Sequence, residues 1–183
     1  MSRIGKKPIE MPEKVTVEID TGIIKVKGPK GELRWNHPDT IKVSVNGGTI
    51  SVERTGDSKA ERALHGLARS LISNMVIGVS HGYQKVLDIV GVGYKAQVTG
   101  DKILLTLGYS HSIQFQLPQG IEASVDPKQI KITLVGIDKQ QIGQVAASLK
   151  ALRLPDAYKG KGIRYSGERI KLKVGKAGKK YFV

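Results

Sequence analysis

The residues best suited by type and spacing to a chemical task lie near the C-terminal end of the chain. There the sequence runs Leu-Pro-Asp-Ala-Tyr-Lys-Gly-Lys-Gly-Ile-Arg-Tyr, so that cations alternate with tyrosines and glycines. Cations neutralise phosphates, tyrosine offers a stacking face with a polar tip, and glycine lets backbone amides approach phosphates closely. The pattern predicts nucleic-acid binding by Tyr158, Lys159, Gly160, Lys161, Gly162, Arg164 and Tyr165.

Basic residues continue beyond this run and also begin the chain. Cations alternate with apolar residues over 169–174, which predicts an edge strand with one cationic face. A tail rich in glycine and lysine follows, and it should reach phosphates if it orders on binding. The candidate contacts are Arg169, Lys171, Lys173, Lys176, Lys179 and Lys180 in this extension, and Arg3, Lys6 and Lys7 in the N-terminal arm.

The net charge of +14 is concentrated in these two segments. Residues 155–183 hold nine basic and two acidic side chains, and the first eight residues hold three basic ones. The 146 residues between them carry 18 basic and 14 acidic side chains, a net of only +4. A nearly balanced body with basic ends is typical of a chain that meets a polyanion. A solvated tail that only aids solubility is the alternative.

The composition narrows the class of protein. With 39% apolar residues the chain can bury a core, and 183 residues allow one domain or two small ones. The lack of cysteine excludes a disulfide framework and suits a reducing compartment. No run approaches the ~18 apolar residues of a membrane span, and the first residues lack a signal-peptide stretch. We expect a soluble intracellular protein without a membrane partner.

Motifs for catalysis or cofactor binding are missing from the sequence. Gly91-Val92-Gly93 lacks the third glycine of a dinucleotide fingerprint and opens no helix, so we interpret it as a bulge or a close packing point. The four histidines are scattered without a chelating pair, and no serine lies on a nucleophile elbow. We predict no enzyme activity, no cofactor, no metal site and no small-molecule substrate.

The first half of the chain predicts an antiparallel meander covered by a helix. Ser58 and Glu61 have capping-box spacing, and apolar residues recur at helical spacing from there to Gly78. On that helix Arg62, His65 and Arg69 should face solvent or nucleic acid. Short β-rich runs, separated by turn residues, lie at 15–19, 23–27, 31–35, 41–45 and 49–53. The expected buried helix positions are Ala60, Ala63, Leu64, Leu67, Ala68, Leu71, Ile72, Met75 and Val76.

The same order of elements then recurs. We expect strands within 83–98, 103–107, 112–117, 121–125 and 129–135, and a helix from Asp138 to Pro155. When residues 23–72 are shifted by 80 positions without a gap, nine of fifty residues are identical, among them Lys59 and Lys139 at the helix starts. Trp35 aligns with Phe115 and is expected in the core, whereas Tyr94 and Lys95 are left between solvent and nucleic acid.

The repeat predicts an α+β fold of two tandem similar domains from a duplication, each a mostly antiparallel sheet covered by one helix. The first domain, residues 1–82, carries the basic N-terminal arm. The second, residues 83–183, carries the basic extension at 155–183. Removal of that extension should leave two folded domains.

The segment from Pro155 to Tyr165 resembles the signature of the bacterial-type L-six protein family of the large ribosomal subunit. The chain departs from the family pattern at Ser112, at Leu154 and in its apolar last three residues. Other segments resemble the family in order along the chain, namely 1–9, 26–33 (Val-Lys-Gly-Pro-Lys-Gly-Glu-Leu), 63–71, 87–96 and 136–147.

The resemblance implies a structural component that binds large-subunit ribosomal RNA, mainly through the second domain and its extension. It places the protein near the factor-binding region, close to the sarcin–ricin loop and the stalk base, on a cytoplasmic or organellar ribosome. Neighbouring ribosomal proteins and nearby translation factors are the implied partners. Two other classes stay open at this stage: an RNA- or DNA-binding regulator acting off the ribosome, and an enzyme with a site that no motif reveals.

Overall fold

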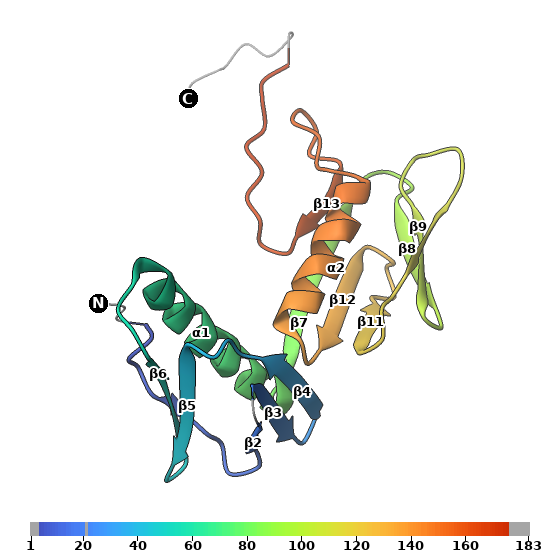
Figure 1. Cartoon of the computed structure of the whole chain (residues 1–183). Helices are drawn as coiled ribbons and strands as arrows, with labels where there is room; N and C mark the ends of the chain where they lie inside the picture. Colours follow the sequence, from blue (N-terminus) through green and yellow to red (C-terminus); the bar gives the residue numbers. More distant parts are fainter. Residues whose placement is uncertain (1–3, 21, 176–183) are drawn as a thin grey trace. The chain divides into compact units, whose positions relative to one another are not determined.

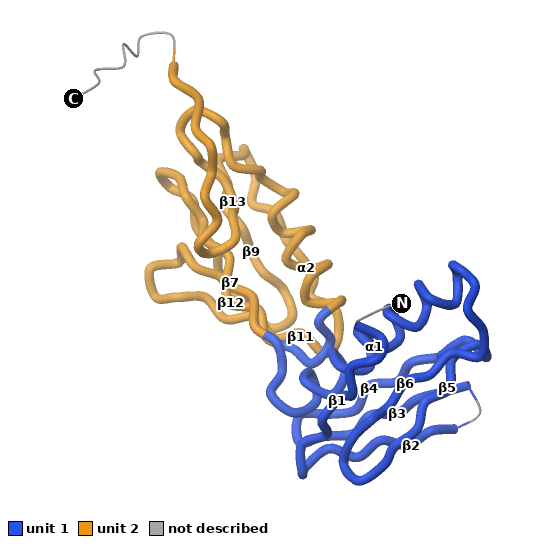
Figure 2. The backbone as a smooth tube through the Cα atoms, turned by 90° about the vertical axis from the view of Figure 1, so that its left-hand side faces the viewer, with its two compact units in different colours: residues 1–83, 136–139 blue, residues 84–135, 140–183 orange. Residues whose placement is uncertain are grey.

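The computed structural model describes residues 4–20 and 22–175 as an α+β protein with two helices and several short sheets (Figure 1). The chain divides into two compact units (Figure 2), one formed by residues 1–83 and 136–139 and the other by residues 84–135 and 140–183. The α+β class and the pair of similar domains expected from the sequence are confirmed. Each unit is described by itself below.

The strands of the first unit form two three-stranded antiparallel sheets. One has the order β1-β6-β5 and the other the order β2-β3-β4. Gly47 and Gly48 have φ angles of 54° and 84°, which the tight turn between β5 and β6 requires. The strands are β1 (Ile9–Glu10), β2 (Thr16–Asp20), β3 (Ile23–Gly28), β4 (Gly31–Asn36), β5 (Ile41–Asn46) and β6 (Thr49–Arg54).

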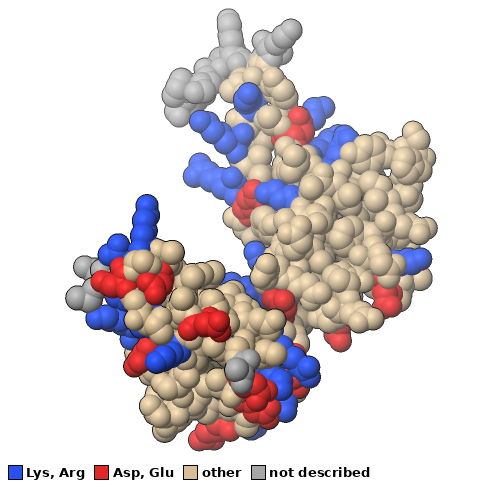
Figure 3. Space-filling view, viewed as in Figure 1, with Lys and Arg blue, Asp and Glu red and all other residues tan. Residues whose placement is uncertain are grey.

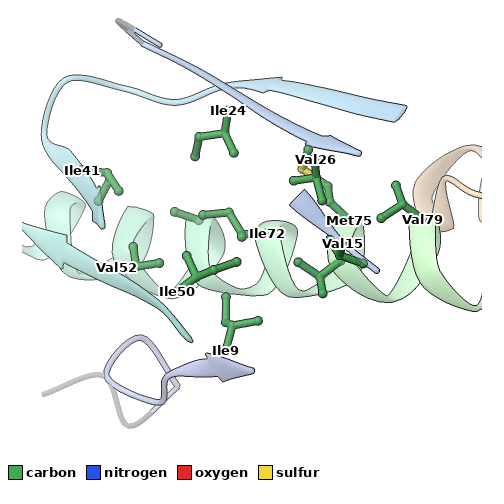
Figure 4. Close-up of a cluster of buried hydrophobic side chains, with 12 residues drawn as sticks. Ile9, Val15, Ile24, Val26, Ile41, Ile50, Val52, Ile72, Met75 and Val79 are labelled. Atoms are coloured by element: carbon green, nitrogen blue, oxygen red, sulfur yellow. The ribbon is translucent and has the colours of Figure 1, made fainter. Parts of the chain in front are cut away.

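Helix α1 (Lys59–Ser80) packs on both sheets and closes the core of this unit. Its capping box is confirmed, because the Glu61 amide donates to Ser58 Oγ at 3.2 Å and the Ser58 amide donates to Glu61 Oε2 at 3.0 Å. Figure 4 shows Ile72 of the helix between side chains from both sheets, among them Ile24 and Ile50. All three are fully buried. Trp35 packs half-buried against this cluster, as expected.

The buried stripe of α1 differs from the apolar stripe that the sequence suggested. Leu67 is 52% exposed and Ala63 is exposed, whereas His65, expected on the polar face, is only 3% exposed. The His65 ring nitrogen Nε2 lies 2.8 Å from the carbonyl oxygen of Val52. Because a carbonyl only accepts, Nε2 carries the proton and donates, which compensates for burying the ring. Apolarity alone could not predict this bond.

The second unit also contains two antiparallel sheets. The strands run in the orders β10-β9-β8 and β11-β12-β7-β13. Helix α2 (Lys139–Leu152) lies beside the second of these sheets in both views (Figures 1 and 2), and it buries Ile142, Val145, Ala146 and Leu149. The strands are β7 (Tyr83–Val90), β8 (Lys95–Thr99), β9 (Lys102–Thr106), β10 (Ile113–Gln116), β11 (Ile121–Val125), β12 (Lys131–Gly136) and β13 (Gly162–Tyr165).

The two units repeat one another with a local slip of two residues. The helices begin 80 positions apart, but β12 begins at residue 131 where a shift of 80 from the start of β6 gives 129. The longer loop before β12 is closed by a bond from the Asp126 amide to the Lys131 carbonyl. The partner of Ile50 is therefore Ile132, which is fully buried, and not Ile130, which is 39% exposed.

Gly91 after β7 is a close packing point, as interpreted from the sequence, whereas a Cβ on Gly93 would meet no atom within 4 Å. A Cβ on Gly91 would lie 2.6 Å from the ring of Tyr94, and one on Gly108 would lie 2.8 Å from it. The glycines thus admit the ring into the second unit, where Tyr94 is 9% exposed. Tyr94 belongs to the core, and its neighbour Lys95 is exposed.

Candidate nucleic-acid interface

The basic extension leaves helix α2 through a turn organised by Asp156. One oxygen of this carboxylate accepts hydrogen bonds from the amides of Lys159 at 2.9 Å and Tyr158 at 3.2 Å. These amides hold the pKa of Asp156 below its usual value. The turn therefore holds Lys159 and Tyr158, which is 59% exposed, at the surface next to each other.

The two glycines of the predicted site, Gly160 and Gly162, are both buried within the second unit. A Cβ on Gly162 would lie 2.6 Å from the carbonyl oxygen of Leu154, and one on Gly160 would lie 3.4 Å from the side chain of Leu172. Both have positive φ, 147° and 66°. The close backbone approach that we expected toward phosphates is made here to the chain's own residues.

Strand β13 joins the central residues of the extension to the body of the unit. It pairs antiparallel with β7, with Ile163 opposite Ile89 and Arg164 opposite Asp88. Ile163 is fully buried and Arg164 is half-buried. The expectation that removing residues 155–183 leaves both domains intact is therefore wrong, because that deletion takes a core side chain and a whole strand from the sheet.

Tyr165 supports two lysines from other elements. The ammonium groups of Lys85, on β7, and Lys150, on α2, lie 4.9 and 4.8 Å from the centroid of its ring. Contacts of this kind attract a cation to the face of an aromatic ring. The ring predicted to stack on bases thus also gathers cations that the sequence pattern did not include.

Glu168 closes the open edge of β13. Its carboxylate accepts hydrogen bonds from Lys150 Nζ at 2.6 and 2.8 Å and from the Tyr165 amide at 3.0 Å. The lysine above all, and then the amide, hold the pKa of Glu168 below its usual value. The carboxylate thereby occupies the backbone donor that a further strand would need.

The edge strand predicted over 169–174 is not formed. With the Tyr165 amide occupied by Glu168, the chain instead runs back to the Asp156 turn, where the Lys173 amide donates to the Ala157 carbonyl at 2.7 Å. Arg169, Lys171 and Lys173 are exposed along this stretch. The predicted contacts Lys176, Lys179 and Lys180 lie outside the described residues.

The cations of the extension form no ion pair within the part of the chain that the structure describes. Its two acids are engaged elsewhere, Asp156 with backbone amides and Glu168 with Lys150. In Figure 3 Lys and Arg gather along the extension, whereas basic and acidic groups intermingle on the first unit. The exposed or half-buried cations of the extension are Lys159, Lys161, Arg164, Arg169, Lys171 and Lys173.

Four cations of the first unit take part in ion pairs instead. Lys25 pairs with Asp20 at 2.6 Å and Lys27 with Glu18 at 2.9 Å on the β2-β3-β4 sheet. Exposed pairs of this kind contribute little to stability, but they cancel the local field. The ion pairs therefore lower the positive field of the first unit, whereas no ion pair lowers that of the extension's cations within the described residues.

The N-terminal arm is fixed to helix α1. Arg69 donates from Nε to the Lys7 carbonyl at 3.0 Å, and Gly5 is buried so closely against the His65 ring that a Cβ would lie 2.5 Å from it. Lys6 and Lys7 are exposed and border a pocket of about 570 Å³. Arg69 thus orders the arm, a role its sequence position did not suggest, and Arg3 lies outside the described residues.

Three further cations border the extension and were missed by sequence reasoning. Lys85 and Lys150 meet at Tyr165, and the guanidinium of Arg153 lies 4.9 Å from the centroid of the Tyr109 ring. Lys150 and Arg153, at the end of α2, could have been included from the sequence, because they stand just before the basic run. Lys85 is 80 residues away from Tyr165 and only strand pairing brings them together.

Within residues 4–20 and 22–175 no group of His, Asp and Glu side chains could hold a metal ion. Neither helix is long and apolar enough to cross a membrane. The arrangement on the extension can attract and orient a polyanion: cations without acidic partners, an exposed tyrosine, and a backbone fixed by a turn and a strand.

Comparison with known proteins identifies the group to which the chain is similar. The sequence model of the family described as ribosomal protein L6 matches residues 11–82 and 90–166. A protein named large ribosomal subunit protein uL6 from Thermodesulfovibrio yellowstonii is 59% identical over 98% of this chain and 100% of its own. The uL6 proteins of Halalkalibacterium halodurans and a Picosynechococcus strain are 52% and 49% identical over 98% of this chain and 100% of their own.

Proposed function

Because the chain belongs to the ribosomal protein L6 family, which is structural and not enzymatic, we propose that it stabilises large-subunit ribosomal RNA. The second unit and its extension make the main contact in this proposal. The family resemblance further suggests a site near the factor-binding region, close to the sarcin–ricin loop and the stalk base. From there the protein supports subunit assembly and translation on a cytoplasmic ribosome.

One observation carries the RNA-binding role. The exposed or half-buried cations of the extension form no ion pair within the described residues, whereas four cations of the first unit do. Lys and Arg side chains that no carboxylate neutralises are free to neutralise the phosphates of an RNA backbone. We assign to RNA the exposed or half-buried residues of the extension, and we keep the buried Gly160 and Gly162 as residues that shape it.

The division of roles follows the division of the chain. Residues 83–183 are proposed to hold the main RNA surface, and residues 1–82 to add a secondary contact through Lys6 and Lys7. Neighbouring ribosomal proteins and translation factors are the further partners that we propose. Arg3, Lys176, Lys179 and Lys180 lie outside the described residues, so they are included in this proposal on the basis of the sequence alone.

Salt dependence of binding tests the proposal. If about six phosphates are engaged, the affinity of the full chain for a large-subunit rRNA fragment should fall with salt at a log–log slope of roughly −5. A chain ending after Glu168 keeps Ile163, β13 and the Lys150 bond, and should show a much weaker affinity and a shallower slope. A flat salt dependence in the full chain would contradict phosphate contact.

Sedimentation separates the ribosomal role from that of a regulator acting off the ribosome. The full chain should co-sediment with large subunits through a high-salt gradient, because specific contacts survive salt better than non-specific ones. The chain ending after Glu168 should be released under the same conditions. Recovery of the full chain only at the top of the gradient would favour the regulator.

A further inference from the structure

Strand β5 is the last strand of its sheet, so among the described residues no strand pairs with one side of its backbone. The Thr55 amide donates to the Thr40 carbonyl at 3.1 Å, which marks residues 40 and 55 as a hydrogen-bonded pair. Bonded and non-bonded pairs alternate along an antiparallel ladder. The register therefore turns residues 42, 44 and 46 toward β6, and turns the N–H and C=O groups of Val43 and Val45 outward.

Val43 borders a groove in the first unit. Its volume is about 540 Å³, with Ile41 to Ser44 of β5 on one side and Ile19, Asp20 and Gly22 on the other. Val43 and Val45 are half-buried against the core, and Ile19 is 40% exposed. No backbone partner for Val43 or Val45 on this side is found in residues 4–20 and 22–175. An extended segment laid along β5 would cover the apolar groups and bond the backbone.

In the second unit, the strand equivalent to β5 is covered by another strand. Its strands β8 and β11, equivalent to β2 and β5, pack against each other. In the first unit the groove lies between the equivalent residues, Ile19 and Val43 among them. Natural sheets usually protect a free edge with proline, a bulge or charges, and β5 has only Lys42. Of the two equivalent strands, β5 of the first unit therefore keeps its six-residue edge open.

The charges around the groove indicate the chemistry of its occupant. Asp20, Asp39 and Glu53 line it, against Lys42. Asp20 is bonded to Lys25, while Asp39 and Glu53 are exposed and without an ion pair in the described residues. A net negative groove in a chain of charge +14 repels a phosphate backbone and attracts a cationic polypeptide.

We propose that β5 is a docking edge for an extended, cationic segment of another polypeptide, which adds antiparallel to the β1-β6-β5 sheet. Residues of the segment that bond Val43 and Val45 turn their side chains to the same face as those valines, toward the core. These residues are apolar, and the alternate ones carry Lys or Arg toward solvent and the carboxylates. Strand addition of this kind derives affinity from the backbone and specificity from alternate side chains.

Only every second residue of the added strand should form hydrogen bonds with β5, and this alternation can be tested. The full chain, labelled with ¹⁵N, is titrated with the peptide Lys-Val-Lys-Val-Thr-Val-Lys while the amide exchange of Val43 and Val45 is followed. Binding should slow exchange at both amides. The peptide N-methylated at its valines should lose about tenfold or more in affinity, because two or more hydrogen bonds are removed. The peptide N-methylated at its lysines should bind normally. Equal binding of both methylated peptides, or the reverse order, would overturn the proposal.

Variants of β5 test the protein side. Val43→Pro removes the outward N–H and keeps the bonds to β6, since proline is tolerated where the donor faces solvent, and it also changes the side chain that packs against the core. It should weaken the peptide about tenfold, and Val43→Ala, which keeps the amide, should weaken it much less. Neither change should alter the salt dependence of rRNA binding, so a failure here and a failure of the rRNA role are distinguishable.

Two other occupants have their own signatures. An RNA oligonucleotide should shift amides of the extension and leave Val43 and Val45 unchanged, and slowed exchange at Val43 with RNA would overturn the proposal. A second copy of the chain paired at β5 would give protected valines and a dimer in sedimentation without peptide. That result would also overturn it.

Discussion

Lys150 Nζ lies 2.6 Å from one carboxylate oxygen of Glu168 and 2.8 Å from the other, so the last turn of helix α2 is joined to the residue where the extension leaves β13. The same lysine lies over the ring of Tyr165. One ion pair thus fixes the direction in which the exposed cations beyond residue 168 leave the body of the unit.

Glu168→Gln should loosen the extension without unfolding the unit. Glutamine loses the charge-assisted bonds to Lys150, so we expect faster amide exchange at Tyr165 and easier proteolysis between residues 168 and 175. Asp101→Asn makes the same change of charge at an exposed site of the second unit and should leave both readouts unchanged. Equal protection of Tyr165 in the wild type and Glu168→Gln would show that the carboxylate does not order this segment.

Acid should release the Asp156 turn and the Glu168 contact. Both folded pKa values lie below the ordinary values of 3.8 and 4.5, so the stabilisation is fully present above those values. It is lost as the pH falls through the lower folded pKa. Protection of the Lys159 and Tyr165 amides, corrected for intrinsic exchange, should decrease in this acid range. Asp156→Asn should remove the pH dependence at Lys159 only.

The repeated architecture was predictable because its signals are local. Turn glycines, alternation and the Ser58–Glu61 capping box each act within a few residues, and they recur along the chain. The slip at β12 was not predictable from an ungapped shift, because the Ile50 and Ile130 identity lies across a loop that is longer in the second unit. Hydrogen bonding, not hydrophobicity, decided that His65 is buried.

The candidate interface was predictable in its residue types and much less in their roles. Alternation over 169–174 favoured a strand, but a carboxylate three residues beyond Tyr165 occupies the donor that the strand needs. Cations that meet at Tyr165 come from β7 and α2, and only the tertiary structure brings them together. Long-range pairing of this kind leaves no pattern in one sequence.

Exposed cations of the last described stretch should determine the salt dependence of RNA binding. Replacing Arg169, Lys171 and Lys173 by alanine should weaken binding to an rRNA fragment. The log–log slope should become shallower by about one unit for each phosphate that is no longer neutralised. The unfolding midpoint should not change, because all three side chains are exposed.

A matched set of variants separates direct binding from net charge. Lys102, Lys128 and Lys131 are exposed on β9, in the loop before β12 and on β12, so their replacement by alanine removes the same charge from the second unit. This set should reduce affinity far less than the first. Equal losses of affinity in both sets would mean that RNA responds to the overall charge of the chain and not to the extension.

Gly162→Ala should destabilise the second unit through the start of β13. Gly162 has φ 147°, and its new Cβ would lie 2.6 Å from the Leu154 carbonyl oxygen, a backbone atom that cannot move aside. Strain and overlap together should cost about 3 kcal/mol or more of unfolding free energy, measured by chemical denaturation with circular dichroism.

Gly100→Ala also requires a positive φ, of 57°, but meets no atom within 4 Å, so it should cost only about 1–2 kcal/mol. Fluorescence of Trp35, the only tryptophan, reports the first unit and should change little in either variant. Equal costs for the two glycines would show that the approach to Leu154 relaxes freely, and that the extension is not fixed at this crossing.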